Sequence, residues 1–145
     1  MHPGAVLRAA LTAKDLIVAP GVYDMVSARI ADSLGFKALY MTGYGVSASL
    51  GLPDAGLATY TEMVARVAQI CQGTTTPVIC DADTGFGGLL NLERTVKGYE
   101  AAGAAAIQIE DQVFPKRCGH TPGRRVIPVD DMVRKIEVAA APAAS

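Results

Sequence analysis

Acidic side chains follow an apolar run that begins at Val78, where the sequence VICDADTGFGG places Asp81 and Asp83 two residues apart. On an extended strand, residues at positions i and i+2 share a face, so both carboxylates can point at one place. Neighbouring carboxylates repel each other, and a hard divalent cation such as Mg²⁺ relieves that repulsion. The alternative is a turn in which Asp83, Thr84 and Gly85 cap the next helix.

A second apolar run, AAIQIED, ends in Glu110 and Asp111. Both runs have the composition of buried parallel strands, and the carboxyl ends of parallel strands meet at one edge of a sheet. Glu110 therefore supplies a further oxygen from a neighbouring strand. Gathered carboxylates at such an edge are typical of divalent-metal sites in α/β folds.

A basic loop follows, in which the sequence KRCGH surrounds Cys118 with Lys116, Arg117 and His120. A positive field favours the thiolate form of cysteine and makes it competent in proton transfer or nucleophilic attack. Gly119 lets the backbone bend closely around a small ligand. The alternative is a basic solvent loop that happens to contain a cysteine.

A third group, YMTGYG, starts at Tyr40. Thr42 and the amides around Gly43 have the chemistry to hold an anionic carboxylate. A plain turn is the alternative for this segment. Asp54, in GLPDAG, is a weaker signal, because aspartates are common in loops.

Strand and helix patterns alternate along the chain. Strands are predicted at residues 16–19, 37–43, 77–82 and 105–111, and helices at residues 4–13, 24–34, 59–72, 91–102 and 130–139. Asp24 is predicted as an N-cap and Thr61 as a further cap, while Gly35 and Gly103 end helices. Loops are predicted at residues 43–56 and 112–128. This alternation predicts βαβ units and a parallel sheet.

Two α/β architectures fit that alternation, a doubly wound sheet and a (β/α)₈ barrel of the TIM type. The first strand is not followed by the phosphate-binding motif G-x-G-x-x-G, which weakens the dinucleotide-binding form of the doubly wound sheet. Charged residues at the ends of several strands favour the barrel. A complete barrel typically takes about 250 residues. The 145 residues are therefore predicted to form one partial barrel domain, residues 1–145, with about the first four β/α units.

The charge and composition of the chain limit the kinds of partner that it can bind. The formal net charge is -1 and half of the residues are hydrophobic, which argues against nucleic acid or an anionic membrane as partner. No apolar run approaches the ~20 residues that span a bilayer. Three irregularly spaced cysteines and the lack of a signal-peptide pattern favour a cytoplasmic protein.

Four segments together resemble the isocitrate lyase/phosphoenolpyruvate mutase superfamily over residues 17–136. They are GVYDMVSARIADSLGFKALYMTG, SLGLPD, DADTGFGG and IEDQ-x-x-PKRCGH. The KRCGH loop resembles the lyase branch, with 2,3-dimethylmalate and 2-methylisocitrate lyases most similar. The resemblance implies a Mg²⁺-dependent (Mn²⁺ as an alternative), usually tetrameric barrel. Such an enzyme cleaves a carbon–carbon bond in a 2-hydroxy di- or tricarboxylate and releases a 2-oxoacid and a carboxylic acid.

The resemblance also implies residue roles. Asp81 and Asp83 match the metal-binding pair, while Glu110 and Asp54 match acids that reach the metal mainly through water. The residues on the loop that grips the 2-oxoacid are Tyr40, Thr42, Gly43 and Tyr44. The residues on the mobile gating loop are Lys116, Cys118, Gly119 and His120. Cys118 matches the general acid, and Tyr40 is a candidate base. Tyr44 stands where methylisocitrate lyases have a small residue, which leaves the substrate open.

By the same resemblance, later strands of the family supply an arginine and further acids, so little or no activity is expected from these residues alone. Three alternatives remain: an oxaloacetate hydrolase or decarboxylase, an enzyme like carboxyphosphonoenolpyruvate or phosphoenolpyruvate mutase, and a non-catalytic half-barrel.

Overall fold

The computed structural model describes residues 2–14 and 16–141. Its centre is a four-stranded sheet in the order β1-β2-β3-β4, and all three strand pairs are parallel. The strands are β1 (Gly21–Val22), β2 (Leu39–Met41), β3 (Val78–Asp81) and β4 (Ala106–Gln108). Strands that follow one another in both sequence and space, joined through helices, confirm the predicted α/β class with a parallel sheet.

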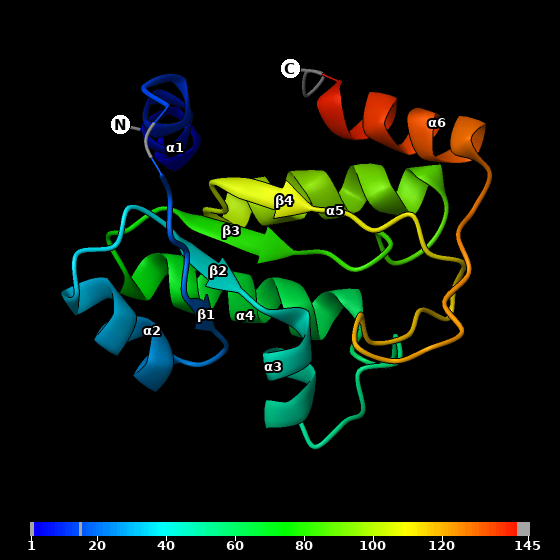
Figure 1. The fold of residues 1–145 in the computed structure, drawn as a ribbon, viewed down its shortest axis with the longest axis horizontal. Helices are drawn as coiled ribbons and strands as arrows, with labels where there is room; N and C mark the ends of the chain where they lie inside the picture. The colour runs from blue at the N-terminus through cyan, green and yellow to red at the C-terminus, as the bar shows by residue number, and fades with distance from the viewer. Residues whose placement is uncertain (1, 15, 142–145) are drawn as a thin grey trace.

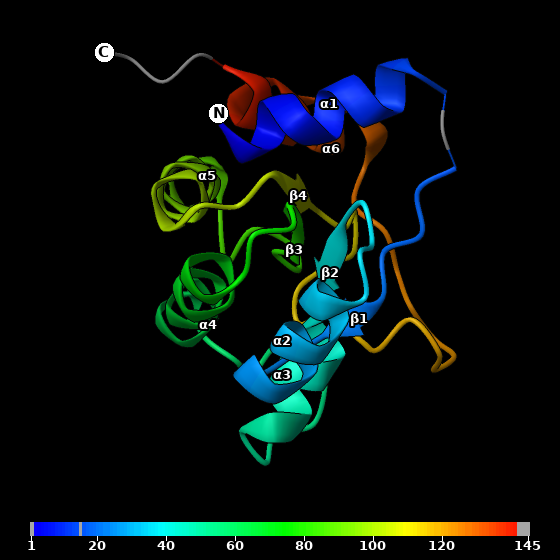
Figure 2. The same ribbon diagram turned by 90° about the vertical axis from the view of Figure 1, so that its left-hand side faces the viewer.

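Helices cover one face of this sheet. Figure 2 shows α4 (Tyr60–Gly73) and α5 (Leu89–Ala102) side by side on that face. The remaining helices are α1 (Pro3–Thr12), α2 (Met25–Ser33), α3 (Gly43–Ser49) and α6 (Val129–Ala140). In Figure 1, α6 lies over α5, and the long segment between β4 and α6 runs past the ends of the strands to reach it.

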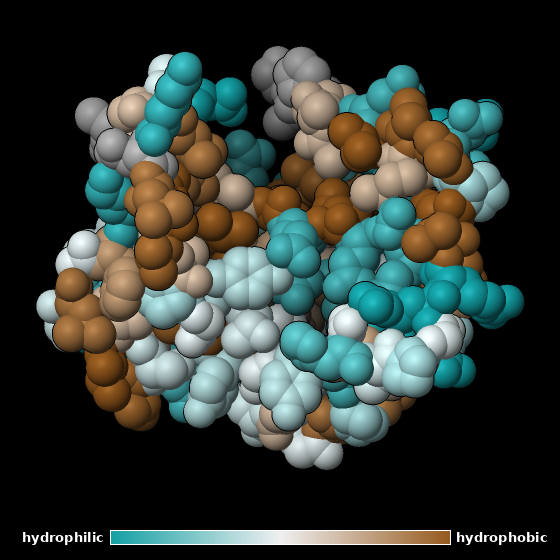
Figure 3. Space-filling view, viewed as in Figure 1, coloured by the Kyte–Doolittle hydropathy of each residue, from teal (hydrophilic) through white to brown (hydrophobic). Residues whose placement is uncertain are grey.

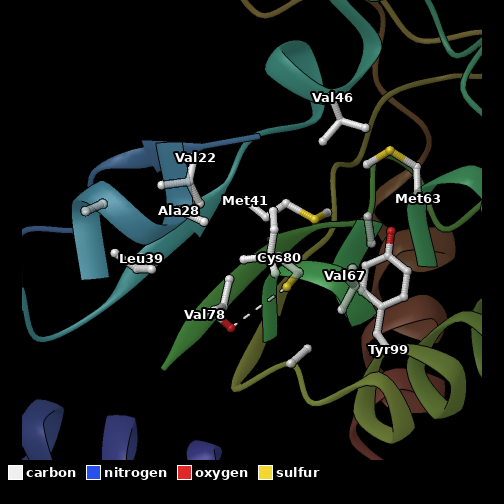
Figure 4. Close-up of a cluster of buried hydrophobic side chains, with 14 of the residues drawn as sticks. Val22, Ala28, Leu39, Met41, Val46, Met63, Val67, Val78, Cys80 and Tyr99 are labelled. Atoms are coloured by element: carbon white, nitrogen blue, oxygen red, sulfur yellow. Dashed lines mark hydrogen bonds between the residues drawn. The ribbon is translucent and has the colours of Figure 1, made fainter. Parts of the chain in front are cut away.

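The core lies between the sheet and its helices. Leu39, Met41, Val78 and Cys80 alternate with more exposed neighbours along β2 and β3, and all four are buried in one core cluster that also contains residues of α2, α4 and α5 (Figure 4). The intervening Tyr40 is only half-buried, because it faces the other side of the sheet. The side that carries Tyr40 is therefore the one open to a ligand.

Local signals set several helix ends as predicted. Asp24 caps α2, where its Oδ1 accepts from the Ser27 amide at 2.8 Å. Gly35 and Gly103 follow helices with φ of 74° and 103°, a backbone conformation that glycine adopts at no steric cost. These caps depend on sequence neighbours alone, which is why the sequence reveals them.

Two predicted elements are wrong. Residues 16–19 form no strand, and Leu16 and Val18 are 85% and 56% exposed; the strand β1 begins later, at Gly21. The predicted loop at residues 43–56 begins instead with the helix α3. A smaller correction concerns α4, whose cap is Thr59 rather than Thr61. For the strand and for α3, long-range pairing or packing outweighs the local pattern, whereas Thr59 caps α4 through a local capping box with Glu62.

Within the described part of the chain, every helix is too short or too polar to traverse a bilayer. Figure 3 shows apolar side chains in the hollow between α1 and α6, and hydrophilic ones over the loop between β4 and α6. The apolar hollow has a volume of about 710 Å³ and is lined by α1, α5, β4 and α6. The hydrophilic region is the one that the candidate residues occupy.

Candidate functional site

Asp81, the last residue of β3, is held from three directions. Its Oδ2 accepts from the Gly43 amide at 3.1 Å, and its Oδ1 accepts from the Asp83 amide at 3.0 Å. The Tyr99 hydroxyl donates to its backbone oxygen at 3.1 Å. Asp81 is 7% exposed, so both of its oxygens are satisfied inside the protein and its carboxylate has one defined position.

Gly43 permits this arrangement by its lack of a side chain. A Cβ at this position would lie 2.8 Å from Asp81 Oδ2 and 3.0 Å from its Cγ. Gly43 is the first residue of α3, and Thr42 caps that helix by accepting from the Gly45 amide at 3.3 Å. The end of β2 therefore delivers an amide to a carboxylate on β3, and only glycine lets the two approach so closely.

Asp83 lies in a tight turn just beyond β3. Its φ is 47°, and the Gly85 amide donates to the Ala82 oxygen at 2.8 Å. The Glu110 amide donates to the Asp83 oxygen at 2.7 Å, which links the turn to the segment after β4. The alternative turn thus exists, but it caps no helix, since Gly88 is the N-cap of α5. The turn instead carries the Asp83 side chain, 8% exposed, into the interior.

Lys116 joins two of the predicted acids. Its ammonium lies 2.8 Å from Asp83 Oδ1 and also forms an ion pair with Asp54 Oδ1. The three side chains are 3%, 8% and 7% exposed for Lys116, Asp83 and Asp54. Asp54 comes from the segment after α3, 62 residues before Lys116. The structure therefore places Asp54 against a lysine, where the sequence predicted a water-mediated contact to a metal.

Burial and charge act in opposite directions on this group. Burial by itself lowers the pKa of Lys116, but its hydrogen bonds and charge contacts with Asp54 and Asp83 outweigh burial and raise that pKa. Burial raises the pKa of Asp83, because its removal from water outweighs the lowering effect of Lys116, and the charges of Asp81 and Asp54 act in the same sense as burial. Lys116 therefore keeps its positive charge. Asp83 is a buried carboxylate whose ionised form any nearby cation stabilises.

The carboxylates of Asp81 and Asp83 have the chemistry of metal ligands, but Lys116 already lies beside Asp83. Asp83 Oδ1 is buried, and the Lys116 ammonium lies beside it at 2.8 Å. Among residues 2–14 and 16–141, no three or more His, Cys, Asp or Glu side chains are grouped to hold a metal ion. Mg²⁺ commonly needs only one or two protein carboxylates, with waters and substrate completing its shell. Asp81 and Asp83 are suitable ligands once the lysine leaves.

Glu110 and Asp54, the two acids predicted to reach the metal mainly through water, each have a partner within the protein. Asp54 pairs with Lys116, and the Glu110 side chain accepts a hydrogen bond from Gln112. Both acids lie near the strand ends, but each is bound by a cation or donor of the protein itself.

Tyr40 reaches across the sheet to β4. Its hydroxyl donates to Gln108 Oε1 at 3.0 Å. Burial raises its pKa, and the charges of Asp81, Glu110 and Asp83 raise it further. In this state the phenol keeps its proton, which opposes its predicted role as a base and suits a hydrogen-bond donor. Tyr44 is 61% exposed on α3, so it lies at the outer rim of the candidate site rather than among its buried residues.

The loop after β4 presents the remaining predicted residues less tightly. Cys118 is half-buried, with its backbone oxygen accepting from Thr121 Oγ1 at 2.8 Å, and Gly119 and His120 are exposed. Gln112 braces the loop: its Nε2 donates to the Arg117 oxygen at 3.0 Å, and the Arg117 amide donates to its Oε1 at 3.1 Å. The sequence reasoning missed Gln112, although its place inside the IEDQ segment was a usable signal.

A second contact that the sequence did not reveal comes from α6. Lys135 Nζ donates to the Thr84 oxygen at 2.9 Å, 51 residues earlier in the chain. Thr84 directly follows Asp83 in the buried turn. An outer helix is thus bonded to the turn that carries a candidate metal ligand.

Comparison with known proteins gives the same family along almost the whole chain. Residues 7–145 match the phosphoenolpyruvate phosphomutase family. A 2,3-dimethylmalate lyase from Eubacterium barkeri is 54% identical over 140 residues, which is 96% of this chain and 48% of that protein. A 2-methylisocitrate lyase from Aeropyrum pernix is 51% identical over 135 residues, 93% of this chain and 44% of that protein. The chain spans about half the length of the curated relatives it matches.

Solved structures agree. An oxaloacetate acetylhydrolase in complex with the inhibitor 3,3-difluorooxalacetate superposes with a TM-score of 0.92 at 43% identity, covering 95% of this chain and 48% of the other. A phosphonopyruvate hydrolase in complex with oxalate and Mg²⁺ superposes with a TM-score of 0.89 at 33% identity, covering 100% of this chain and 50% of the other.

Proposed function

This chain belongs to the phosphoenolpyruvate phosphomutase family of the isocitrate lyase/phosphoenolpyruvate mutase superfamily, and we propose that it provides the metal-binding half of a carbon–carbon lyase. The substrate class is a 2-hydroxy di- or tricarboxylate of the 2,3-dimethylmalate or 2-methylisocitrate type. The identity of 54% to a 2,3-dimethylmalate lyase and 51% to a 2-methylisocitrate lyase supports this class. The products are a 2-oxoacid and a carboxylic acid.

The observation that carries the proposal is the buried pair Asp81 and Asp83 at the carboxyl end of β3. Carboxylate oxygens are the hard ligands that Mg²⁺ or Mn²⁺ prefers, and a divalent cation offsets the cost of burying two neighbouring negative charges. When bound, the ion supplies Lewis-acid polarisation of a 2-hydroxycarboxylate. A Mg²⁺ complex in the related phosphonopyruvate hydrolase supports the choice of metal. Glu110 and Asp54 belong to the outer surroundings of this site.

The chain's own residues then have distinct tasks. Tyr40, which keeps its proton, donates a hydrogen bond to a substrate oxygen, and Thr42 and Gly43 bind the 2-oxoacid end with Tyr44 at the rim. Lys116 and His120 offset the negative charge of the departing carboxylic acid. The substrate's 2-hydroxyl loses its proton to solvent as the carbon–carbon bond breaks, and Cys118 gives its thiol proton to the carbon that retains the electron pair of that bond. Gly119 allows the loop to fold over the substrate, which excludes water while that carbanion exists.

The proposal is tested on two proteins. The 145-residue chain is assayed with Mg²⁺, and so is a chimera in which it replaces the matched 140 residues of the Eubacterium barkeri lyase. We expect little or no turnover from the chain alone and cleavage of 2,3-dimethylmalate or 2-methylisocitrate by the chimera. Loss of that cleavage in an Asp81→Asn chimera completes the test. A soluble chimera that cleaves neither substrate refutes the proposal.

A second candidate is hydrolysis of oxaloacetate to oxalate and acetate. The superposition on an oxaloacetate acetylhydrolase favours it, since that structure aligns with a TM-score of 0.92. The same chimera, supplied with oxaloacetate, distinguishes the two activities by whether oxalate appears. Supplying phosphonopyruvate in a further arm tests the mutase-like alternative. A chain that binds neither Mg²⁺ nor pyruvate by calorimetry is instead a non-catalytic half-barrel.

Two further assignments belong to the same proposal. We take residues 1–145 as one partial barrel domain, acting in a cytoplasmic homo-oligomer of tetrameric size. Sedimentation of the chimera tests the oligomer directly, and a monomer that turns over substrate contradicts it.

A further inference from the structure

We propose that the Lys116 ammonium and a divalent cation are alternative occupants of one position beside Asp83, so that metal entry releases the loop that carries Cys118. This inference rests on the proposed metal site and adds a regulation to it. The metal would not simply fill a vacant pocket. It would displace an internal cation that the chain itself supplies.

The geometry gives the first step. Lys116 Nζ lies 2.8 Å from Asp83 Oδ1, and this oxygen is buried. A Mg²⁺ ion bound to that oxygen would stand at about 2.1 Å from it. Both cations would then lie on one side of one carboxylate, within the distance at which like charges repel strongly. Asp83 therefore has room for one of them at a time.

The loop around Lys116 gives the second step. Pro115 and Arg117 on either side of the lysine are exposed, whereas Lys116 itself is 3% exposed. Lys116 is thus the buried anchor within an otherwise solvent-facing segment, and Gln112 braces the backbone of the neighbouring Arg117. Cys118 follows two residues later. Loss of the contact with Asp83 removes half of that anchor, and Asp54 alone remains to hold the ammonium.

The third step concerns charge balance. Asp81 has both oxygens satisfied by backbone amides and needs no cation for its hydrogen bonds. Asp83 depends on Lys116, because apart from that ammonium, 2.8 Å away, no described group donates a hydrogen bond to its Oδ1. Lys116 is thus the counter-ion of the apo state, and it stabilises the carboxylates in the absence of metal. The same contact lowers the apparent affinity of the site for metal, since a competent state must first be freed.

The first experiment measures metal binding on the purified chain. Mn²⁺ is titrated by calorimetry, with free Mn²⁺ counted in parallel by electron paramagnetic resonance, into the wild type, Lys116→Gln and Lys97→Gln. Lys97 is the matched control, because its ion pair among the described residues is with Glu93 on the surface of α5. We expect Lys116→Gln to bind Mn²⁺ on the order of tenfold more tightly and Lys97→Gln to bind as the wild type does. A Lys116→Gln affinity equal to or weaker than that of the wild type overturns the inference.

The second experiment reads the loop without any variant. Trypsin cleaves after exposed lysine and arginine, and Lys116 is protected by burial while Lys97 is not. We expect saturating Mg²⁺ to speed cleavage after residue 116 several-fold and to leave cleavage after residue 97 unchanged. Equal cleavage after residue 116 with and without bound metal contradicts release of the loop.

The two failures are distinguishable. If neither the wild type nor Lys116→Gln binds Mn²⁺, then the proposed metal-dependent function and the inference that rests on it are both refuted. If the wild type binds Mn²⁺ and removal of Lys116 does not tighten binding, the proposed function stands and only the inference fails. A Lys116→Gln chain that does not fold is replaced by Lys116→Arg, whose bulkier cation should still compete and leave the affinity within about threefold of the wild type; tighter binding by that variant also refutes exclusion.

Discussion

The strand end at Asp81 and the loop at Cys118 hold their functional groups in opposite ways. Asp81 is fixed by two backbone amides and is almost fully buried. Cys118 and His120 lie on a segment that depends on one buried lysine and the Gln112 brace. The proposed function, in which a metal is bound in one place and a loop closes over a substrate, uses both kinds of support. The rigid part sets geometry, and the loosely held part moves.

The largest difference between the two regions should appear in Cys118→Ser. This change leaves the strand end intact and replaces a thiol by a much weaker acid. In the chimera we expect turnover to fall by about 10²–10⁴-fold, with no more than a small change in melting temperature. Steady-state kinetics and thermal unfolding together check this. Normal turnover would show that another group protonates the carbon.

A large effect on stability should come from Lys116→Met without metal. Removal of one partner leaves Asp54 and Asp83 buried without their counter-charge, which costs about 3–5 kcal/mol. Urea unfolding in the presence of a chelator measures this loss, and Lys97→Met serves as the surface control. Mg²⁺ should restore part of the loss in Lys116→Met, because the ion replaces the missing charge. A loss below about 1 kcal/mol would mean that the contact is solvated and weak.

At the strand end, Gly43→Ala tests the close approach of backbone and carboxylate. The new Cβ would lie 2.8 Å from Asp81 Oδ2, and the buried carboxylate has little room to retreat. We expect a loss of about 1–3 kcal/mol and weaker metal binding. Gly88→Ala is the matched control, since a Cβ there meets nothing within 4 Å. Equal stability of the two variants would show that Asp81 can shift.

A smaller effect is expected at Asp32, which supports the segment leading into β3. Its carboxylate accepts from the Thr75 and Thr76 amides at 3.1 and 2.9 Å. Burial raises the pKa of Asp32, but these hydrogen bonds outweigh it and hold the pKa below the usual value of 3.8. A lowered folded pKa gives stability that is present above the ordinary pKa and is lost as pH falls through the folded one.

The Asp32→Asn variant should therefore be less stable than the wild type by about 1 kcal/mol at pH 7. The difference should shrink as the pH falls below about 4. Chemical unfolding at pH 7, 5 and 3.5 checks the sign. A gap that widens in acid would contradict the assignment of the hydrogen bonds to the ionised form.

The same contrast explains how far the sequence could be interpreted. The ends of α2, marked by Asp24 and Gly35, depend on neighbours in the chain and were predictable. The parallel sheet followed from the strand–helix alternation. By contrast, β1 was placed too early, because Pro20 and Gly21 resemble a terminator, whereas the Pro20 oxygen in fact accepts from the Tyr40 amide at 3.0 Å. That partner lies on another strand and is invisible to a local pattern.

In the candidate site, residue types were easier to predict than their contacts. Asp81 and Asp83 were identified from their spacing and their place after an apolar run. The ion pair between Lys116 and Asp54 joins residues 62 positions apart, and nothing in either local segment specifies it. The helix α3 was missed because Gly43 and Gly45 favour loops, yet tertiary contacts explain both. A Cβ at Gly45 would lie 2.7 Å from the Tyr23 Cβ.

The bond from Lys135 to the Thr84 oxygen has a consequence for communication across the molecule. Because Thr84 adjoins Asp83, the resting position of that carboxylate depends on where α6 docks. Val133 and Ile136, on the same helix, are 45% and 53% exposed and present apolar side chains that a neighbouring surface can contact. A shift of α6 would therefore move the turn after β3 through the hydrogen bond from Lys135 to Thr84, without any ligand entering the site.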